Sequence, residues 1–483
     1  MRNLARLALV LVAAGPVTID GAGRLRMAST LAVPPQATSA AAPEEKRAAR
    51  FVTYSEARAI VERLAPELAA THGARPASER ESGWHEWMVR RDAEIRARLE
   101  RGDEDSLINL LLFGTSFTRQ PRALNDRSTL GGAERVADVV RRRIEDLVSG
   151  IAEPGANERL QFARALVTRR GIDPATASGR ERTRLYLRAL MERASAEIAS
   201  YGMAIESVRA ARGPEMAARS TLFRARGLSS DTSIRSDFAI DRALEALRDR
   251  RLLDSTSVHR VAVIGPGLDF TDKAEGYDFY PQQTTQPFAL IDSLRRLGLA
   301  AHDLILTTVD LSPRVNSHLQ AAQRRAMDGA VYTMALPRER LSRWAPELLR
   351  FWKTVGRTIG DDARATAVPS GVELRAVGVR PDVVRSLRVR DLNVILERLD
   401  PLPDGERFDV VIATNVLVYY DVVEQSLALS NIASMLRPGG LLLSNNVLVE
   451  LPTTPIESIG HTDAVYSDRP DDRDQVVWYQ RRL

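Results

Sequence analysis

The stretch that decides the fold of this chain is Val258-His-Arg-Val-Ala-Val-Ile-Gly-Pro-Gly-Leu-Asp269. Within it, residues 261–264 are a short, wholly apolar run, which is typical of a parallel-sheet strand that is covered on both faces. Gly265 and Gly267 follow at once, and glycine there permits a tight turn and a close approach of backbone N–H groups to a ligand. Many buried strands end in Gly-x-Gly, so this motif alone does not indicate a ligand site. The sequence downstream of it provides the further evidence.

After Val258 the sequence alternates between apolar runs of strand length and helical patterns, which is typical of an α/β doubly wound domain. We therefore predict a Rossmann-like sheet in residues 255–483, with insertions at 271–286 and 330–370. The expected strands are 261–264, 304–310, 372–379, 383–389, 408–415, 441–444, 458–466 and 474–480, and the expected helices are 287–297, 314–326, 341–352 and 424–436. Strands 372–379 and 383–389 surround an Arg-Pro-Asp sequence and are predicted to form a hairpin or a pair.

The N-terminal half shows a different pattern. Apolar residues recur at spacings of three and four, with Gly, Pro and Asn between the segments, which predicts an all-α domain of roughly seven helices over residues 50–254. Residues 1–49 are predicted to be a leader followed by an Ala/Pro-rich linker. The polar segment 224–233 precedes the last helix of this half and is either a linker or a loop that closes over a ligand.

The amino-acid composition excludes or disfavours several classes of functional site. The 68 basic and 63 acidic residues are interspersed, so the charge pattern gives no clear signal for nucleic acid. The chain has no cysteine, which excludes disulfides, thiolate zinc sites and cysteine nucleophiles. Its six histidines are scattered, and we expect no metal site.

Polar residues follow the expected strands in an order that suits an adenosine ligand, which lies outside the carboxyl ends of the strands on such a sheet. They are Gly265, Pro266, Gly267 and Asp269 after the first strand, Asp310 at the end of the second, Asp391 and Leu392 after the third, and Thr414 and Asn415 after the fourth. An acid at the position of Asp310 accepts both ribose hydroxyls, and Asp391 with Leu392 suits the adenine edge. A role as a helix N-cap would explain each of these acids taken singly. It does not explain why all of them occur in this order after a strand that ends in Gly-x-Gly.

At these residues the chain resembles the class I S-adenosylmethionine-dependent methyltransferases, over about residues 258–483. The motifs that carry the resemblance are Val263-Ile-Gly-Pro-Gly-Leu-Asp269, Thr308-Val-Asp310, Arg390-Asp-Leu-Asn393, Phe408-Asp-Val-Val-Ile-Ala-Thr-Asn415 and Leu436-Arg-Pro-Gly-Gly440. Asn415-Val-Leu-Val-Tyr-Tyr-Asp421 is also similar to a stretch of the chemotaxis-receptor glutamate methyltransferases, which carry a helical N-terminal domain. Thr414 stands where they have Arg, so their substrate is not carried over.

The resemblance implies S-adenosyl-L-methionine as the cofactor, bound by the strand-end residues named above. It also implies a methyl acceptor, a small molecule or a protein, beside Asn415 and Tyr419. Asn415 would orient the acceptor through its side-chain carbonyl, and Tyr419 lies just beyond it. These two are the candidate catalytic residues.

The insertion 271–286 leaves the glycine turn directly beside the expected pocket. Its aromatic residues Tyr277, Phe279 and Tyr280 are predicted to form a lid that closes over the bound cofactor or acceptor and excludes water. Loops of this length in compact domains are usually either functional or disordered.

Two other functions remain open. A nucleotide-dependent oxidoreductase is disfavoured by Phe270, which stands where the dinucleotide motif has its third glycine. A non-catalytic scaffold with a methyltransferase-like fold is favoured only by residues 1–22, whose basic start and short apolar run resemble a signal peptide and indicate export or membrane tethering. A cytoplasmic location is the alternative, because S-adenosylmethionine is a cytoplasmic cofactor.

Overall fold

The structure is a computed structural model that describes residues 49–123, 132–210, 227–271, 277–364, 368–445 and 447–482. The expected leader and nearly all of the expected linker therefore lie outside the described residues. Among the described helices, none combines the length and the apolar character that crossing a membrane requires.

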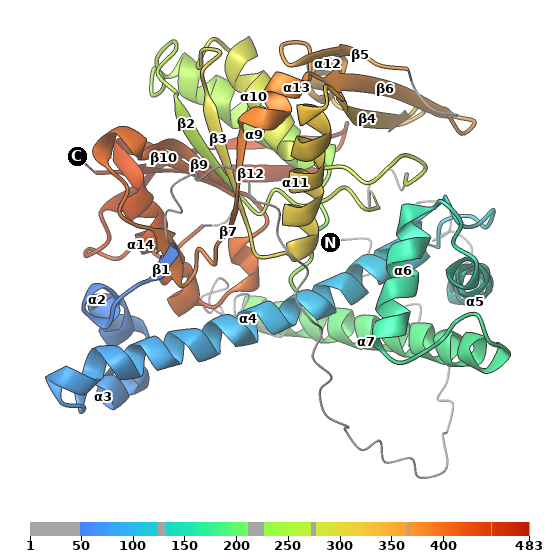
Figure 1. Ribbon diagram of the computed structural model, residues 1–483, viewed down its shortest axis with the longest axis horizontal. Coiled ribbons are helices and arrows are strands. Elements are labelled where there is room, and N and C mark those ends of the chain that lie inside the picture. Colours follow the sequence, from blue (N-terminus) through green and yellow to red (C-terminus); the bar gives the residue numbers. More distant parts are fainter. Residues whose placement is uncertain are drawn as a thin grey trace.

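A seven-stranded sheet forms the centre of the C-terminal half, in the order β11-β12-β10-β9-β2-β3-β7 (Figure 1). Its strands are β2 (Arg260–Ile264), β3 (Ile305–Asp310), β7 (Leu387–Asp391), β9 (Phe408–Ala413), β10 (Leu436–Ser444), β11 (Ile456–Val465) and β12 (Arg473–Arg481). The five strands from β7 to β10 are parallel, and β12 is antiparallel to both of its neighbours. The prediction of a doubly wound sheet is confirmed.

Strand β2 lies at the centre of the five parallel strands, where both of its faces are covered, and its side chains are apolar on both faces. Val261 and Val263 pack into one core, with helices α9 (Ile234–Asp249), α10 (Gln286–Arg296) and α11 (Pro313–Met327). Ala262 and Ile264 pack into the other core, with α14 (Val422–Met435) and the first helices of the chain. This alternation is what a strand with a period of two requires when both faces are covered.

Helix α9 was expected within the helical domain, but its buried residues lie in the core of the sheet domain. Its apolar face includes Phe238, Leu244 and Leu247, each at most 1% exposed. An amphipathic pattern shows that a helix has a buried face but does not show which core receives it.

The expected pair of strands at 372–389 is wrong. Residues 383–386 belong to helix α13 (Pro381–Ser386), which begins with a proline at a position where proline is favourable. Strand β6 (Val372–Val379) instead pairs with β4 (Tyr332–Glu339) and β5 (Gly360–Asp362) in a separate antiparallel sheet. These two strands lie within the predicted insertion 330–370, and its helix α12 (Pro346–Thr354) starts at Pro346 instead of residue 341.

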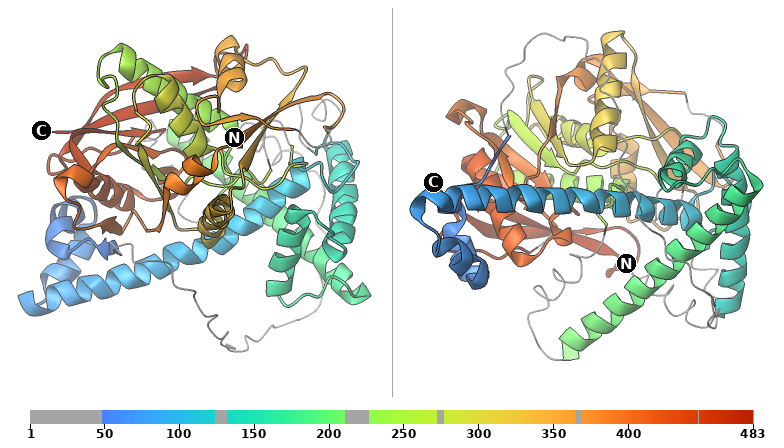
Figure 2. Two further views of the ribbon diagram at one scale, coloured as in Figure 1. Left: turned by 45° about the horizontal axis from the view of Figure 1, so that its top comes forward. Right: turned by 60° about the horizontal axis from the view of Figure 1, so that its bottom comes forward.

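The N-terminal half is helical as predicted, apart from one short strand. Its helices are α2 (Tyr54–Leu64), α3 (Pro66–Gly73), α4 (Ala77–Phe113), α5 (Gly132–Ala152), α6 (Glu158–Arg169) and α7 (Ala177–Ala210). Strand β1 (Ala49–Phe51) pairs with β8 (Glu397–Leu399) and so ties the start of this half to the sheet domain. Short 3-10 turns lie at Asp404–Glu406 and Leu417–Tyr419. The long helix α4 runs across the sheet domain, and α5, α6 and α7 gather at its far end (Figures 1 and 2).

Candidate functional site

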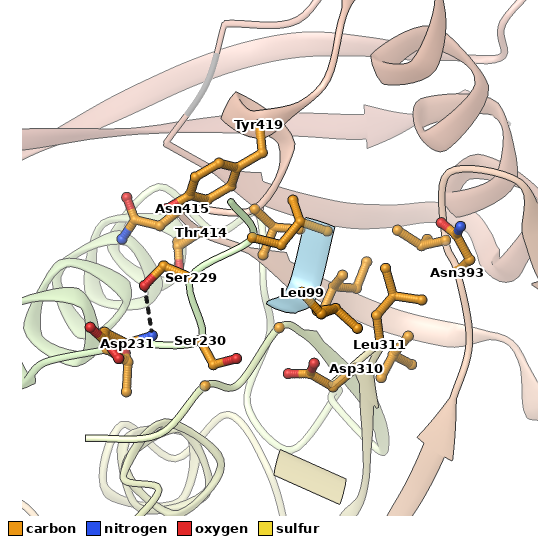
Figure 3. A pocket seen from close by; sticks show the side chains of 18 of the residues that line it. Leu99, Ser229, Ser230, Asp231, Asp310, Leu311, Asn393, Thr414, Asn415 and Tyr419 are labelled. Carbon is orange, nitrogen blue, oxygen red and sulfur yellow. Dashed lines mark hydrogen bonds between the residues drawn. The ribbon is translucent and has the colours of Figure 1, made fainter. Parts of the chain in front are cut away.

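A pocket opens at the carboxyl ends of β2, β3, β7 and β9 (Figure 3). The pocket lies where the order of the parallel strands reverses, between β2 and β9, which is the usual ligand position on such sheets. It is lined by Leu99, Leu228, Ser229, Ser230, Asp231, Thr232, Ile264, Gly265, Gly267, Gln286, Val309, Asp310, Leu311, Leu392, Asn393, Val394, Thr414, Asn415, Val416, Tyr419 and Tyr420.

The glycine turn forms one wall. Gly265 and Gly267 have φ angles of 66° and 67°, a region that residues with a side chain rarely adopt. A Cβ atom on Gly267 would lie 2.6 Å from the carbonyl oxygen of Ser230. The glycine is therefore required by a neighbouring segment of this chain, before any ligand is considered.

Asp310 lines the pocket at the end of β3. One carboxylate oxygen accepts a hydrogen bond from the backbone N–H of Ser312 at 2.7 Å, and the backbone N–H of Gly267 also donates to the carboxylate. Burial raises the pKa of Asp310 to about 6, although these two donors oppose the shift. At neutral pH the group is therefore mainly an ionised acceptor of hydrogen bonds.

Asn415 lies at the rim, just beyond β9, in a left-handed conformation with φ 58°. Asn445 holds it at two points: the Asn415 N–H donates to Asn445 Oδ1 at 2.8 Å, and Asn445 Nδ2 donates to Asn415 Oδ1 at 2.5 Å. Asn415 Nδ2 in turn donates to Ser236 Oγ at 3.2 Å. The side-chain carbonyl that was expected to orient an acceptor thus already receives a hydrogen bond within the protein.

Replacing Asn445 by alanine is expected to destabilise the fold by about 1–3 kcal/mol, because both hydrogen bonds that hold Asn415 are lost. Replacement by aspartate should cost less. A carboxylate still accepts from the Asn415 N–H, and the Asn415 amide can turn so that its Nδ2 donates to the second oxygen. Urea denaturation measures both changes, and equal losses for the two variants would show that these hydrogen bonds are not what holds Asn415.

Three residues predicted for the site lie outside the pocket. Asp391 ends the edge strand β7, where its half-exposed side chain pairs with Arg96 of α4 at 2.9 Å. Asp269 accepts hydrogen bonds from Tyr280 Oη and Gln283 Nε2 in the buried loop that follows the glycine turn. Pro266 is buried within the turn and does not line the pocket either. Leu392 and Tyr419, in contrast, both line it.

The predicted lid is corrected by the structure. Tyr277 and Tyr280 are 8% and 2% exposed and pack with Phe279 against the small sheet, away from the pocket. Asp278 of the same loop accepts hydrogen bonds from the backbone and hydroxyl groups of Thr115 and Ser116, which follow the C-terminal end of α4. The described part of this loop therefore attaches the helical domain to the sheet domain, and residues 272–276 lie outside the described part.

Several pocket residues were not predicted. Leu228 to Thr232 form a wall, although their segment was considered only as a linker or a closing loop. Gln286 begins α10, and Leu99 comes from α4 of the helical domain. The polar residues Ser229 to Asp231, which precede the glycine strand, were a weak sequence signal for a ligand-binding segment. Nothing in the local sequence around Leu99 predicts that it lines the pocket. Within the described ranges, no three His, Asp or Glu residues gather as metal ligands.

Comparison with known proteins gives one match to a family model, described as a methyltransferase domain, over residues 370–444. These residues include β7, β9 and β10 and thus two of the strand ends that form the pocket. No curated protein matches the chain.

Among solved structures, the chain is similar to DesVI of Streptomyces venezuelae at 11% identity and a TM-score of 0.20, over 50% of this chain and 63% of that one. It therefore spans less than two thirds of that protein. The mitomycin 7-O-methyltransferase MmcR matches at 13% identity and a TM-score of 0.26, over 84% of this chain and 100% of that one. The glycopeptide N-methyltransferase MtfA, in complex with S-adenosyl-L-methionine, matches at 10% identity and a TM-score of 0.22, over 51% and 94%.

The family match covers β7 and β9, two of the four strands whose ends form the pocket, and motifs quoted from the sequence lie at the ends of both. Residues 370–444 of this chain are therefore similar to a methyltransferase domain.

Proposed function

We propose that the chain transfers the methyl group of S-adenosyl-L-methionine to an acceptor at this pocket. The observation that carries the proposal is the charge of the pocket wall. Asp231 and Asp310 contribute two carboxylates, and the described lining residues include no Lys, Arg or His. A cofactor with a sulfonium cation suits such a wall, because opposite charges attract strongly where water is partly excluded.

The same wall disfavours the oxidoreductase. The diphosphate of a nicotinamide dinucleotide is anionic and binds best at a helix N-terminus or beside basic side chains. Here the glycine turn does not lead into a helix, since α10 begins only at Gln286. The two carboxylates would repel the diphosphate.

The pocket residues fit the parts of S-adenosyl-L-methionine. We assign the ribose hydroxyls to Asp310, which keeps free acceptor capacity on a carboxylate already held by two N–H groups. Leu311 and Leu392 supply an apolar slot for the adenine. Gln286 is 2% exposed, and its Oε1 has no hydrogen-bond partner among the described residues, which suits a donor group at the amino-acid end of the cofactor.

The bound cofactor supplies a methyl group activated by its positive sulfur. For the protein, the main task is then to align the acceptor with that methyl group. We place the acceptor at the rim beside Asn415 and Tyr419, because both lie across the pocket from Asn393 at the adenine end (Figure 3). Asn445 and Ser236 keep the Asn415 side chain in one orientation there.

Calorimetry on the whole chain tests the proposal. S-adenosylmethionine and S-adenosylhomocysteine are expected to bind, and NAD is not. Incubation with S-adenosylmethionine labelled on the methyl group should then transfer label to a component of a cell extract. Tighter binding of NAD would support the oxidoreductase, and cofactor binding without any transfer of label would favour a non-catalytic scaffold.

A further inference from the structure

Helix α4 belongs to the helical domain but reaches the pocket of the sheet domain. Leu99 lines the pocket, and a piece of α4 that carries it stands beside Asp310 and Leu311 in Figure 3. Arg96, about one turn before Leu99, pairs with Asp391 at the end of β7. Arg98, the neighbour of Leu99, donates from Nη2 to the carbonyl oxygen of Tyr419 at 2.7 Å. A single helix thus contacts the end of β7 and the 3-10 turn that follows β9.

Helix α4 also forms hydrogen bonds with residues 227–232, which we call the covering segment. The backbone N–H of Leu228 donates to the carbonyl oxygen of Arg98 at 3.1 Å. Further along, the two carboxylate oxygens of Asp231 accept from Ser106 Oγ at 2.7 Å and from Asn109 Nδ2 at 2.6 Å. Neither Ser106 nor Asn109 lines the pocket, so their contacts act on the covering segment alone.

On its other side the covering segment is joined to the glycine turn. Leu268 N–H donates to the carbonyl oxygen of Ser230 at 2.7 Å, and Thr232 N–H donates to the carbonyl oxygen of Leu268 at 3.1 Å. The segment therefore lies between α4 and the glycine turn, and five of its residues, Leu228 to Thr232, line the pocket.

Two glycines set how closely the segment approaches α4. A Cβ atom on Gly102, within α4, would lie 1.9 Å from the carbonyl oxygen of Leu228, and one on Gly227 would lie 2.4 Å from the backbone nitrogen of Gly102. Glycine inside a helix costs about 1 kcal/mol relative to alanine, so its presence here needs a compensating reason. The reason is the contact between the two backbones, which no other residue permits.

We propose that the covering segment is a cofactor-binding element and that α4 positions it through Gly102 and Asn109. The inference rests on the proposed function and extends it to the helical domain, which becomes part of the binding site. Asp231 lies on the side of the pocket toward Thr414 and Asn415, away from Asn393 (Figure 3). Its carboxylate, fixed by α4, faces the positively charged amino-acid end of S-adenosylmethionine.

Two glycine-to-alanine variants of the same helix provide the first test. Gly102→Ala is expected to lower the affinity for S-adenosylhomocysteine at least about tenfold, because the added methyl group displaces the covering segment from α4. Gly83→Ala is the matched control: its Cβ would meet only the end of the Arg75 side chain, which can turn away. Calorimetry measures the affinities, and equal affinities in folded Gly102→Ala and Gly83→Ala would overturn the proposal.

A second test does not depend on how Gly102→Ala folds. Asn109→Asp places a carboxylate opposite Asp231, and the repulsion should displace the covering segment and lower the affinity for S-adenosylhomocysteine about tenfold. The double variant, Asn109→Asp with Asp231→Asn, removes this repulsion and restores a hydrogen bond with its partners exchanged, so its affinity should rise to that of Asp231→Asn, which lacks only the charge facing the ligand. A double variant no tighter than Asn109→Asp, or an Asn109→Asp variant that binds as the wild type does, would overturn the role of α4.

The wild-type protein separates this inference from the proposed function. If it binds no S-adenosylhomocysteine, the proposed function fails and the inference fails with it. If it binds and all of the variants bind equally well, only the inference fails.

Discussion

Replacing Asp310 by alanine is expected to weaken the binding of S-adenosylhomocysteine by roughly 1.5–3 kcal/mol, the range for hydrogen bonds to a charged group. The carboxylate lines the pocket and is already oriented by the backbone N–H groups of Ser312 and Gly267, so the ribose hydroxyls meet a fixed acceptor. Calorimetry on the folded variant measures the change.

Asp391→Ala is the matched control for this prediction. Asp391 pairs directly with Asp310 in the register of β3 and β7, yet it does not line the pocket. Its replacement should leave the affinity nearly unchanged. Equal losses for the two variants would remove Asp310 from the ribose position.

The binding is also expected to depend on pH in one direction. In the free protein burial raises the pKa of Asp310 to about 6, with Arg314 opposing the shift and Asp391 adding to it. The ligand hydroxyls need the ionised carboxylate, so the affinity should be constant above about pH 7 and fall as the pH drops below 6. In Asp310→Asn this fall should be absent, and a fall of the same size in that variant would assign it to another group.

Replacing Gly267 by alanine is expected to reduce both the stability and the affinity for the cofactor. The left-handed backbone alone costs about 1–2 kcal/mol for a residue with a Cβ atom. A further loss follows because this Cβ would lie 2.6 Å from the carbonyl oxygen of Ser230, so the glycine turn or the covering segment must move. Urea denaturation and calorimetry measure the two effects.

Gly298→Ala separates the two causes of that loss. Gly298 has a similar φ of 71°, but no atom lies within 4 Å of the position of its Cβ. This control should lose only the backbone contribution to stability and should bind S-adenosylhomocysteine as the wild type does. If Gly267→Ala behaves in the same way as Gly298→Ala, then the contact with Ser230 does not shape the site.

The sequence by itself determined the sheet and its central turn, because those signals are local. An apolar run of strand length is buried wherever the chain places it, and Gly265 and Gly267 permit the turn through their own backbone freedom. The order of the strand-end residues also predicted that Asp310, Leu392 and Asn415 would meet at one edge, and all three line the pocket. Carboxyl ends of parallel strands share one edge of a sheet, so chain order is enough for that inference.

The tertiary structure alone decided which of those residues face a ligand and which elements complete the wall. Asp391 and Asp310 both end strands, but β7 lies at the edge of the sheet, where a helix from the other domain supplies Arg96 as a partner. The aromatic loop looked like a lid, yet Asp278 and its neighbours bind the helical domain. Leu99 and the covering segment reach the pocket through contacts between residues more than a hundred positions apart in the chain, such as that of Gly102 with Leu228. Such contacts depend on how whole elements pack, and no local pattern of residues encodes them.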